Sequence, residues 1–161
     1  MAANTAPLYP LTPNAGVAGN LFYSTVLTNT KAYDGTDTVT AIPSPLLLLY
    51  TAGVNGSRVD SITVRYTSTV GATVSGTTTA SLLRLWINNG TANTTASNNT
   101  LLAELAIPAQ AMVALNTSVV LPLTIPAGFV LPAGYKIYGG ITVAIGGTNA
   151  ALTVSILGGD Y

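Results

Sequence analysis

The sequence predicts an all-β protein: a single antiparallel β-sandwich, most consistent with a jelly roll, that follows an extended N-terminal arm. Three observations predict this fold class. Short runs of β-branched, leucine and aromatic residues recur along the chain, turn residues separate them, and no long stretch has uninterrupted helical periodicity. The length of 161 residues corresponds to one domain, large enough to bury a core without a metal or a disulfide.

The arm is predicted for residues 1–19 and the sandwich domain for residues 20–161. Pro7, Pro10 and Pro13 lie in the arm. Proline fixes its own φ and biases the preceding residue towards extended backbone, so the arm should contain no helix. Its apolar residues require another surface to pack on.

About eight or nine strands follow the arm, each bounded by turn residues. The connections 68–79 and 89–99 are rich in threonine with glycine or asparagine, so they are expected to be loops. The only candidate helix, 101–113, is interrupted by Pro108. The expected strands are 21–28, 37–42, 46–51, 57–67, 80–88, 101–107, 117–125, 135–145 and 151–157.

Alternation of apolar and polar residues assigns faces to two of these strands. In 57–67 the residues that share the apolar face are Ile62, Val64 and Tyr66. In 101–107 Glu104 should point outward, and the residues expected to point inward are Leu101, Ala103, Leu105 and Ile107.

Strand 80–88 has apolar residues on both faces. One face carries Leu83, Leu85 and Ile87, and the other carries Leu82, Arg84 and Trp86. We expect the first face to pack in the core and the second to be covered by an arm or by another subunit.

A Pro-Ala-Gly phrase recurs near the C-terminus. It occurs in Ile125-Pro126-Ala127-Gly128 and in Leu131-Pro132-Ala133-Gly134, and Ile107-Pro108-Ala109 is a partial copy. Proline removes a hydrogen-bond donor from a strand, and glycine favours the fourth position of a type I turn. The phrase is therefore predicted to end strands, and it belongs to the scaffold.

The charge pattern disfavours nucleic acid and membranes as partners. Five Lys and Arg residues balance five Asp and Glu residues, and charged residues make up 6% of the chain, against about 25% in a typical soluble domain. No cationic cluster that could bind phosphates or anionic lipids is present. With a mean hydropathy of +0.51, this neutral chain is expected to have much of its surface covered by neighbours.

The residue inventory argues against an enzyme. The chain has no histidine and no cysteine, which excludes Ser-His-Asp triads, Cys-His dyads and zinc sites with nitrogen or sulfur ligands. A pair of carboxylates remains possible in principle. However, Asp60 and Glu104 are expected to form cross-strand ion pairs with Arg65 or Arg84. No catalytic residue, cofactor or metal is expected.

Asp34-Gly35-Thr36-Asp37 raises the alternative of a calcium site. It lacks the alternating acids and the terminal glutamate of a calcium-binding loop, so a turn is the favoured interpretation. Trp86 and the eight tyrosines raise the alternative of carbohydrate binding. Aromatic residues dispersed over strands are more often core and interface residues.

The chain resembles the small β-sandwich or jelly-roll proteins that decorate, or cement, the heads of tailed bacteriophages. The resemblance is carried by the Thr/Ala/Gly/Val-rich composition with few charges, the proline-rich residues 1–19, the stretch 131–145 and the final residues Gly158-Gly159-Asp160-Tyr161.

The resemblance implies a structural virion protein, made in the host cytoplasm and located on the capsid exterior. Its expected partners are the major capsid protein, whose neighbouring subunits it would cement, and itself, as a homotrimer. An arm that reaches a neighbouring subunit would place Pro7, Leu8, Tyr9, Pro10 and Leu11 at the partner interface. The alternatives are another virion component with a β-sandwich, such as a tail, fibre or minor shell protein, and a carbohydrate-binding module that uses Trp86 and exposed tyrosines.

Overall fold

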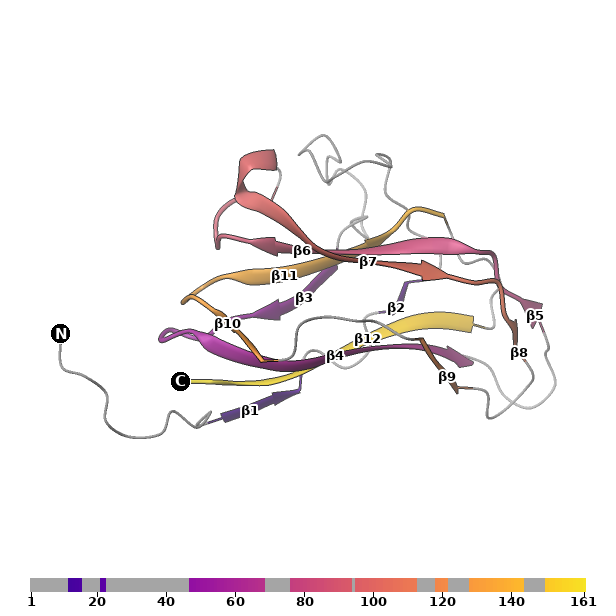
Figure 1. Cartoon of the computed structure of the whole chain (residues 1–161), viewed down its shortest axis with the longest axis horizontal. Helices are drawn as coiled ribbons and strands as arrows, with labels where there is room; N and C mark the ends of the chain where they lie inside the picture. Colours follow the sequence, from indigo (N-terminus) through magenta and orange to yellow (C-terminus); the bar gives the residue numbers. More distant parts are fainter. Residues whose placement is uncertain are drawn as a thin grey trace.

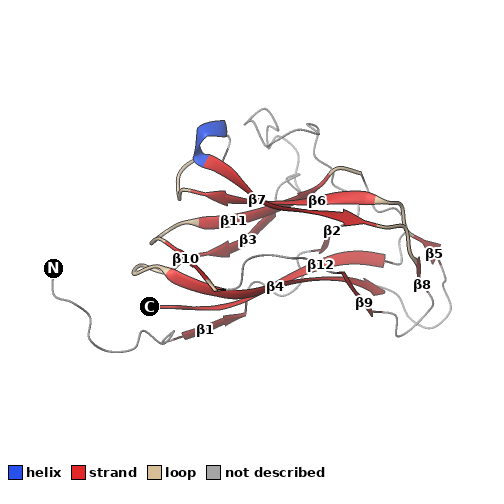
Figure 2. Cartoon of the chain, viewed as in Figure 1, coloured by secondary structure: helices blue, strands red, loops and turns tan. Residues whose placement is uncertain are grey.

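The protein is a two-layered β-sandwich in the part of the chain that the structure describes. This structure is a computed structural model, which describes residues 12–15, 21–22, 47–68, 76–93, 95–112, 118–121, 128–143 and 150–161. In these ranges the elements are strands and one short 3-10 helix, η1 (Ala96–Asn98), as Figure 2 shows. Two antiparallel sheets lie one above the other (Figure 1). The predicted all-β antiparallel sandwich is confirmed, and the jelly-roll strand order stays a prediction.

One layer, the β4–β12 sheet, is built around two long strands. β4 (Ser57–Ser68) and β12 (Ala150–Asp160) pair along nearly their whole lengths. Within the same sheet, β1 (Thr12–Ala15) is the edge strand next to β12, and β10 (Phe129–Leu131) is the edge strand next to β4. Two short strands extend these edges: β2 (Leu21–Phe22) pairs with β12, and β9 (Ser118–Leu121) pairs with β4.

The other layer, the β6–β11 sheet, has four strands in the order β3, β11, β6, β7. Their bounds are β3 (Leu47–Thr51), β11 (Lys136–Ile141), β6 (Ser81–Asn88) and β7 (Asn99–Ile107). A separate two-stranded ribbon joins β5 (Gly76–Thr77) to β8 (Ala111–Met112).

The core lies between the two sheets and follows the predicted alternation. Ile62 and Val64 of β4 are buried, as are Leu83 and Leu85 of β6, and Ile87 packs against this core. Removing such side chains from water stabilises the fold by roughly 25 cal/mol per Å² of apolar surface. The predicted inward faces of β4 and β6 are confirmed at these residues; the side chain of Tyr66 lies outside the described residues.

A β-bulge changes the predicted face of one residue in β7. Leu85 pairs with Ala103, but Trp86 pairs with Leu101, so Leu102 is an additional residue in the register. Leu101 is consequently 45% exposed, whereas Leu102 packs against the core. The prediction that Leu101 points inward was wrong, because an extra residue reverses the alternation on one side of a bulge. Ile107 is buried as predicted.

The structure contains strands that were not among the expected strand ranges. β1 lies within the predicted arm, and β10 begins in the link between the two Pro-Ala-Gly phrases and ends at Leu131, the first residue of the second phrase. β12 extends to Asp160, beyond the predicted end at residue 157, and β11 ends at Ile141. The predicted strand 37–42, together with residues 23–28 of the first predicted strand, lies outside the described residues.

The second Pro-Ala-Gly phrase ends a strand as predicted, but its turn is displaced by one residue. β10 ends at Leu131, and the N–H of Tyr135 donates to the carbonyl of Pro132 at 3.1 Å. Gly134 is therefore the third residue of the turn, with φ of 73°, and not the fourth residue predicted. A positive φ at the third position favours glycine. β7 likewise ends at Ile107, before Pro108; residues 125–127 lie outside the described ranges.

Candidate interaction surface

The predicted partner-binding residues precede an edge strand of the sandwich. Pro7, Leu8, Tyr9, Pro10 and Leu11 lie outside the described residues. The chain that follows them forms β1, in which Thr12 pairs with Asp160 and Ala15 with Leu157. Residues 12–15 of the predicted arm are thus part of the β4–β12 sheet, and Thr12 lies opposite Asp160, the last residue of β12.

A partly buried polar cluster joins the two sheets at this same end. The carboxylate of Asp160 on β12 accepts hydrogen bonds from the Tyr50 hydroxyl of β3 at 3.2 Å and from the Gly53 N–H at 3.3 Å. It also accepts one from the hydroxyl of Ser57, the first residue of β4. Hydrogen bonds to an ionised acceptor are stronger than neutral ones. We refer to Tyr50, Gly53, Ser57 and Asp160 as the Asp160 cluster.

The Asp160 cluster has a structural role. Ser57 is fully buried and Tyr50 is 3% exposed, so a substrate has no access to either hydroxyl. The N–H of Tyr161 also donates to the Gly56 carbonyl at 3.1 Å, which fixes the residue after β12 to the β3–β4 turn. No local pattern in the sequence indicates this cluster, because Ser57 and Asp160 are brought together only by the long β4–β12 pairing.

Tyr50 should make the stability of the fold sensitive to alkaline pH. Burial raises the pKa of its hydroxyl above the ordinary value of 10.0, the Ser57 hydrogen bond opposes this shift, and the negative charge of Asp160 adds to it. A raised pKa contributes stability that is complete below pH 10 and is lost as the pH rises towards the folded-state pKa. We expect the unfolding free energy to fall above about pH 10.

The matched variant Tyr50→Phe should be less stable at neutral pH but should lose less stability between neutral and alkaline pH. Urea denaturation at a series of pH values measures both effects. Burial also raises the pKa of Tyr138, so the variant should keep part of the alkaline decline. Parallel stability profiles for the parent and the variant would contradict this role of Tyr50.

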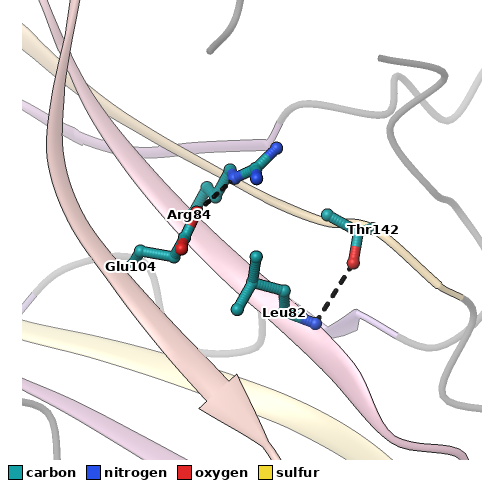
Figure 3. A network of polar contacts seen from close by, with 4 residues as sticks. All are labelled: Leu82, Arg84, Glu104 and Thr142. Atoms are coloured by element: carbon teal, nitrogen blue, oxygen red, sulfur yellow. Dashed lines mark hydrogen bonds and ion pairs between the residues drawn. The ribbon is translucent and has the colours of Figure 1, made fainter. Parts of the chain in front are cut away.

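Two ion pairs neutralise charged residues on the outer faces of the sheets. Arg84 on β6 and Glu104 on β7 pair across strands at 2.6 Å, as predicted, and Figure 3 shows them beside the 3.2 Å hydrogen bond from the Leu82 N–H to Thr142. Asp60 pairs with Arg58 of its own strand at 2.7 Å. Its predicted cross-strand pairing was wrong.

The reason for the unexpected partner of Asp60 is a β-bulge. Leu157 pairs with Ser61, whereas Gly158 pairs with Val59, so Asp60 is the additional residue of β4. A bulge redirects side chains locally. In this structure Asp60 forms its ion pair with Arg58 on the same strand.

Trp86 does not offer an aromatic face to a ligand. It lies on the outer side of the β6–β11 sheet, where Tyr138 and Leu101 are its cross-strand partners, but it is only 1% exposed. Trp86 is already buried in the single chain, so another subunit is not needed to cover it, and the expectation that an arm covers this side of β6 stays a prediction. Sugar recognition by stacking requires an accessible ring, so the carbohydrate-binding alternative loses its main residue.

Two of the exposed aliphatic side chains in the described residues lie on the outer side of the β4–β12 sheet. Val130 of β10 is 59% exposed and pairs with Arg58, and Leu157 of β12 is 53% exposed and pairs with Ser61. The Arg58–Asp60 ion pair belongs to the same part of the sheet. We call Val130, Leu157, Arg58 and Asp60 the Val130–Leu157 face. An apolar surface with a neutralised ion pair is suited to a protein partner.

The described residues contain no group of three acidic side chains that could hold a metal ion. Within the same ranges, no helix has the length and hydropathy needed to span a bilayer. Asp34 and Asp37, the residues of the calcium alternative, lie outside the described residues. No protein-family model, curated protein or solved structure matches the chain. Functional inference therefore depends on the residues and surfaces of this chain itself.

Proposed function

We propose that the chain is a structural virion protein that binds the outside of an assembled phage head and cements neighbouring major capsid subunits. The observation that carries this proposal is the Val130–Leu157 face, where two aliphatic side chains are more than half exposed beside an ion pair that is already neutralised. When a protein covers such a surface, the complex gains the free energy of apolar burial, and each charge of the ion pair keeps its partner.

The position of β1 supports the same function. β1 holds Thr12 opposite Asp160, at the end of β12 that also carries Leu157. Pro7 to Leu11 precede this strand in the sequence. An arm and a face that bind different capsid subunits would bridge them, and a homotrimer on a symmetric shell would multiply these contacts.

The roles of the polar groups also agree with a structural function. Asp160, Ser57 and Tyr50 bond to one another inside the fold, and Glu104 is paired with Arg84. These groups stabilise the scaffold and leave recognition to apolar surface. A tail, fibre or minor shell protein would use similar surfaces, so the choice of particle in the binding experiment separates these virion components.

The double variant Val130→Ser Leu157→Ser should bind undecorated phage heads about tenfold more weakly than the parent chain. Each substitution removes apolar surface that the complex would bury. Co-sedimentation with heads measures the affinity, and urea denaturation should show that the fold is retained. Val143→Ser is the matched control, because Val143 is 45% exposed but lies after β11, in the other sheet's layer. Equal binding by the parent and the double variant would remove this face from the mechanism.

A chain that lacks residues 1–11 tests the arm. This deletion keeps β1, whereas removal of residues 1–19 would also delete an edge strand of the β4–β12 sheet. We expect weaker attachment to heads with an unchanged unfolding midpoint, since the binding contacts of Pro7 to Leu11 are lost while the sandwich remains. Attachment as strong as that of the full chain would show that the arm does not contribute.

A further inference from the structure

Two Asn-Gly pairs occur in the chain, Asn55-Gly56 and Asn89-Gly90, and both lie in described turns. In an Asn-Gly pair the backbone nitrogen of glycine can attack the side-chain amide of asparagine, because glycine has no side chain to hinder the approach. The two pairs have the same residues but different hydrogen bonds, so the rate of this reaction can be compared between them within one molecule.

The fold requires glycine at both positions. Gly56 has φ of 90° and Gly90 has φ of 89°. A Cβ at residue 56 would lie 2.8 Å from the carbonyl oxygen of Leu131, and a Cβ at residue 90 would lie 2.8 Å from that of Gly134. A side chain would thus be strained and would collide with backbone. The turn geometry therefore accounts for the glycine of each Asn-Gly pair.

Both polar atoms of the Asn89 side chain form hydrogen bonds. Its Nδ2 donates to Oδ1 of Asn98 at 3.2 Å, and its Oδ1 accepts from the Thr91 N–H at 3.2 Å and from the Thr91 hydroxyl. The attacking group is also engaged, because the Gly90 N–H donates to Oδ1 of Asn88 at 2.9 Å. Rotation of the Asn89 amide towards Gly90 would break several hydrogen bonds at once.

In the Asn55 side chain, one polar atom, Nδ2, forms a hydrogen bond within the described residues. Asn55 is exposed, and within the described residues its hydrogen bond is from Nδ2 to the Tyr161 carbonyl oxygen at 3.1 Å. The Gly56 N–H donates to the Gly53 carbonyl at 3.0 Å, within a two-residue turn. Fewer hydrogen bonds oppose the rotation that brings the Asn55 amide carbon to the Gly56 nitrogen.

We propose that Asn55 is a site of spontaneous deamidation that loosens the end of β12. The Gly56 nitrogen attacks the Asn55 side-chain carbon and forms a C–N bond, and ammonia leaves with the proton that the Gly56 N–H gives up. Water then adds to one of the two carbonyls of the cyclic imide and breaks one C–N bond. The products are aspartate, or isoaspartate with the backbone rerouted through the side chain.

Either product would weaken the hydrogen bonds that attach Tyr161, the residue after β12, to the β3–β4 turn. Aspartate has no N–H to donate to the Tyr161 carbonyl, and its carboxylate oxygen faces that oxygen instead. Isoaspartate adds a methylene to the backbone beside Gly56, whose carbonyl accepts from the Tyr161 N–H. The Asp160 cluster includes Gly53 and Ser57, which flank this turn. Modification of Asn55 therefore acts directly on the attachment between the β3–β4 turn and the C-terminal end of β12.

Peptide mapping by mass spectrometry of the full folded chain, incubated in mildly alkaline buffer, tests the site. The peptide with Asn55 should deamidate several-fold faster than the peptide with Asn89. The same incubation in denaturant should bring the two rates together, because the hydrogen bonds that distinguish them are lost. Equal rates in the folded chain, faster conversion at Asn89, or a difference that persists in denaturant would overturn the proposal.

Two substitutions test the cause and the consequence. Asn98→Ala removes the acceptor for Asn89 Nδ2 and should raise the Asn89 rate towards that of Asn55; no change would contradict the protection argument. Asn55→Asp reproduces one product and should speed amide hydrogen exchange at Tyr161, while Asn55→Gln, which keeps the NH₂ donor, should change it less. Identical exchange in Asn55→Asp and the parent would show that the modification does not loosen the end of β12.

Discussion

Replacing Gly158 by alanine is expected to lower the unfolding free energy by about 3 kcal/mol, because the new methyl group would collide with backbone. A Cβ at residue 158 would lie 2.2 Å from the carbonyl oxygen of Arg58 and 3.1 Å from Cα of Val59. Both contacts belong to β4, where Asp60 forms the bulge opposite Gly158. Neither group can rotate away, so the central strand pair itself would have to separate.

Gly134→Ala is the matched control for this prediction. Gly134 has φ of 73° in the turn after β10, but a Cβ at this residue would have no atom within 4 Å beyond its own chain neighbours. Alanine there should cost only the left-handed backbone conformation, roughly 1–2 kcal/mol. Urea denaturation of both variants provides the comparison. A loss at Gly158 no larger than that at Gly134 would contradict the large cost assigned to the close approach of β4 to β12.

Replacing Asp160 by alanine should also destabilise the fold by about 3 kcal/mol, because partly buried donors lose an ionised acceptor. The Tyr50 hydroxyl and the Ser57 hydroxyl would both lose their carboxylate partner, and so would the Gly53 N–H. These groups belong to both sheets, so the variant should weaken the connection between the layers at this end. Thermal or urea unfolding measures the loss.

Asp60→Ala is the control for the loss of a carboxylate. Asp60 pairs with Arg58, and both side chains are substantially exposed, at 38% and 48%. Exposed ion pairs contribute about 0–1 kcal/mol. The expected order is therefore a large loss for Asp160→Ala and a small one for Asp60→Ala. A small effect at Asp160 would contradict the structural role assigned to the Asp160 cluster.

The fold class and the strands of the core could be predicted where one face of a strand is buried. Ile62 and Val64 in β4, like Leu83 and Leu85 in β6, alternate with more exposed residues because the sheet has an inner and an outer side. β1 could not be predicted in this way. It is a four-residue edge strand containing Pro13, and its pairing with β12 depends on tertiary contacts that no local pattern encodes.

The bulges and the Asp160 cluster were missed for a related reason. Bulges at Asp60 and Leu102 depend on the register between neighbouring strands, and a one-residue change reverses which side chains are exposed. The same register brings Asp160 to Ser57. The acids were visible in the sequence, and the Arg84–Glu104 ion pair agrees with the prediction that Glu104 pairs across strands with Arg65 or Arg84.

The candidate surface, too, could be predicted from the sequence only in part. Composition predicted that apolar, uncharged surface would be used in binding, but it could not place that surface. Trp86 was a reasonable candidate from its residue type, yet it is buried, whereas Val130 lies in a link where no strand was expected and is exposed. Burial depends on which segments cover a sheet, and this information is absent from local alternation.

Thermal denaturation of undecorated phage heads, with and without saturating protein, tests whether the chain cements an assembled head. A protein that bridges neighbouring capsid subunits binds the assembled shell and not its separated subunits, so it should raise the temperature at which the shell dissociates. We expect saturable binding at a stoichiometry set by the shell symmetry, together with this rise in temperature. Heads that bind no protein, or that bind it and denature at an unchanged temperature, would show that the chain does not cement the head.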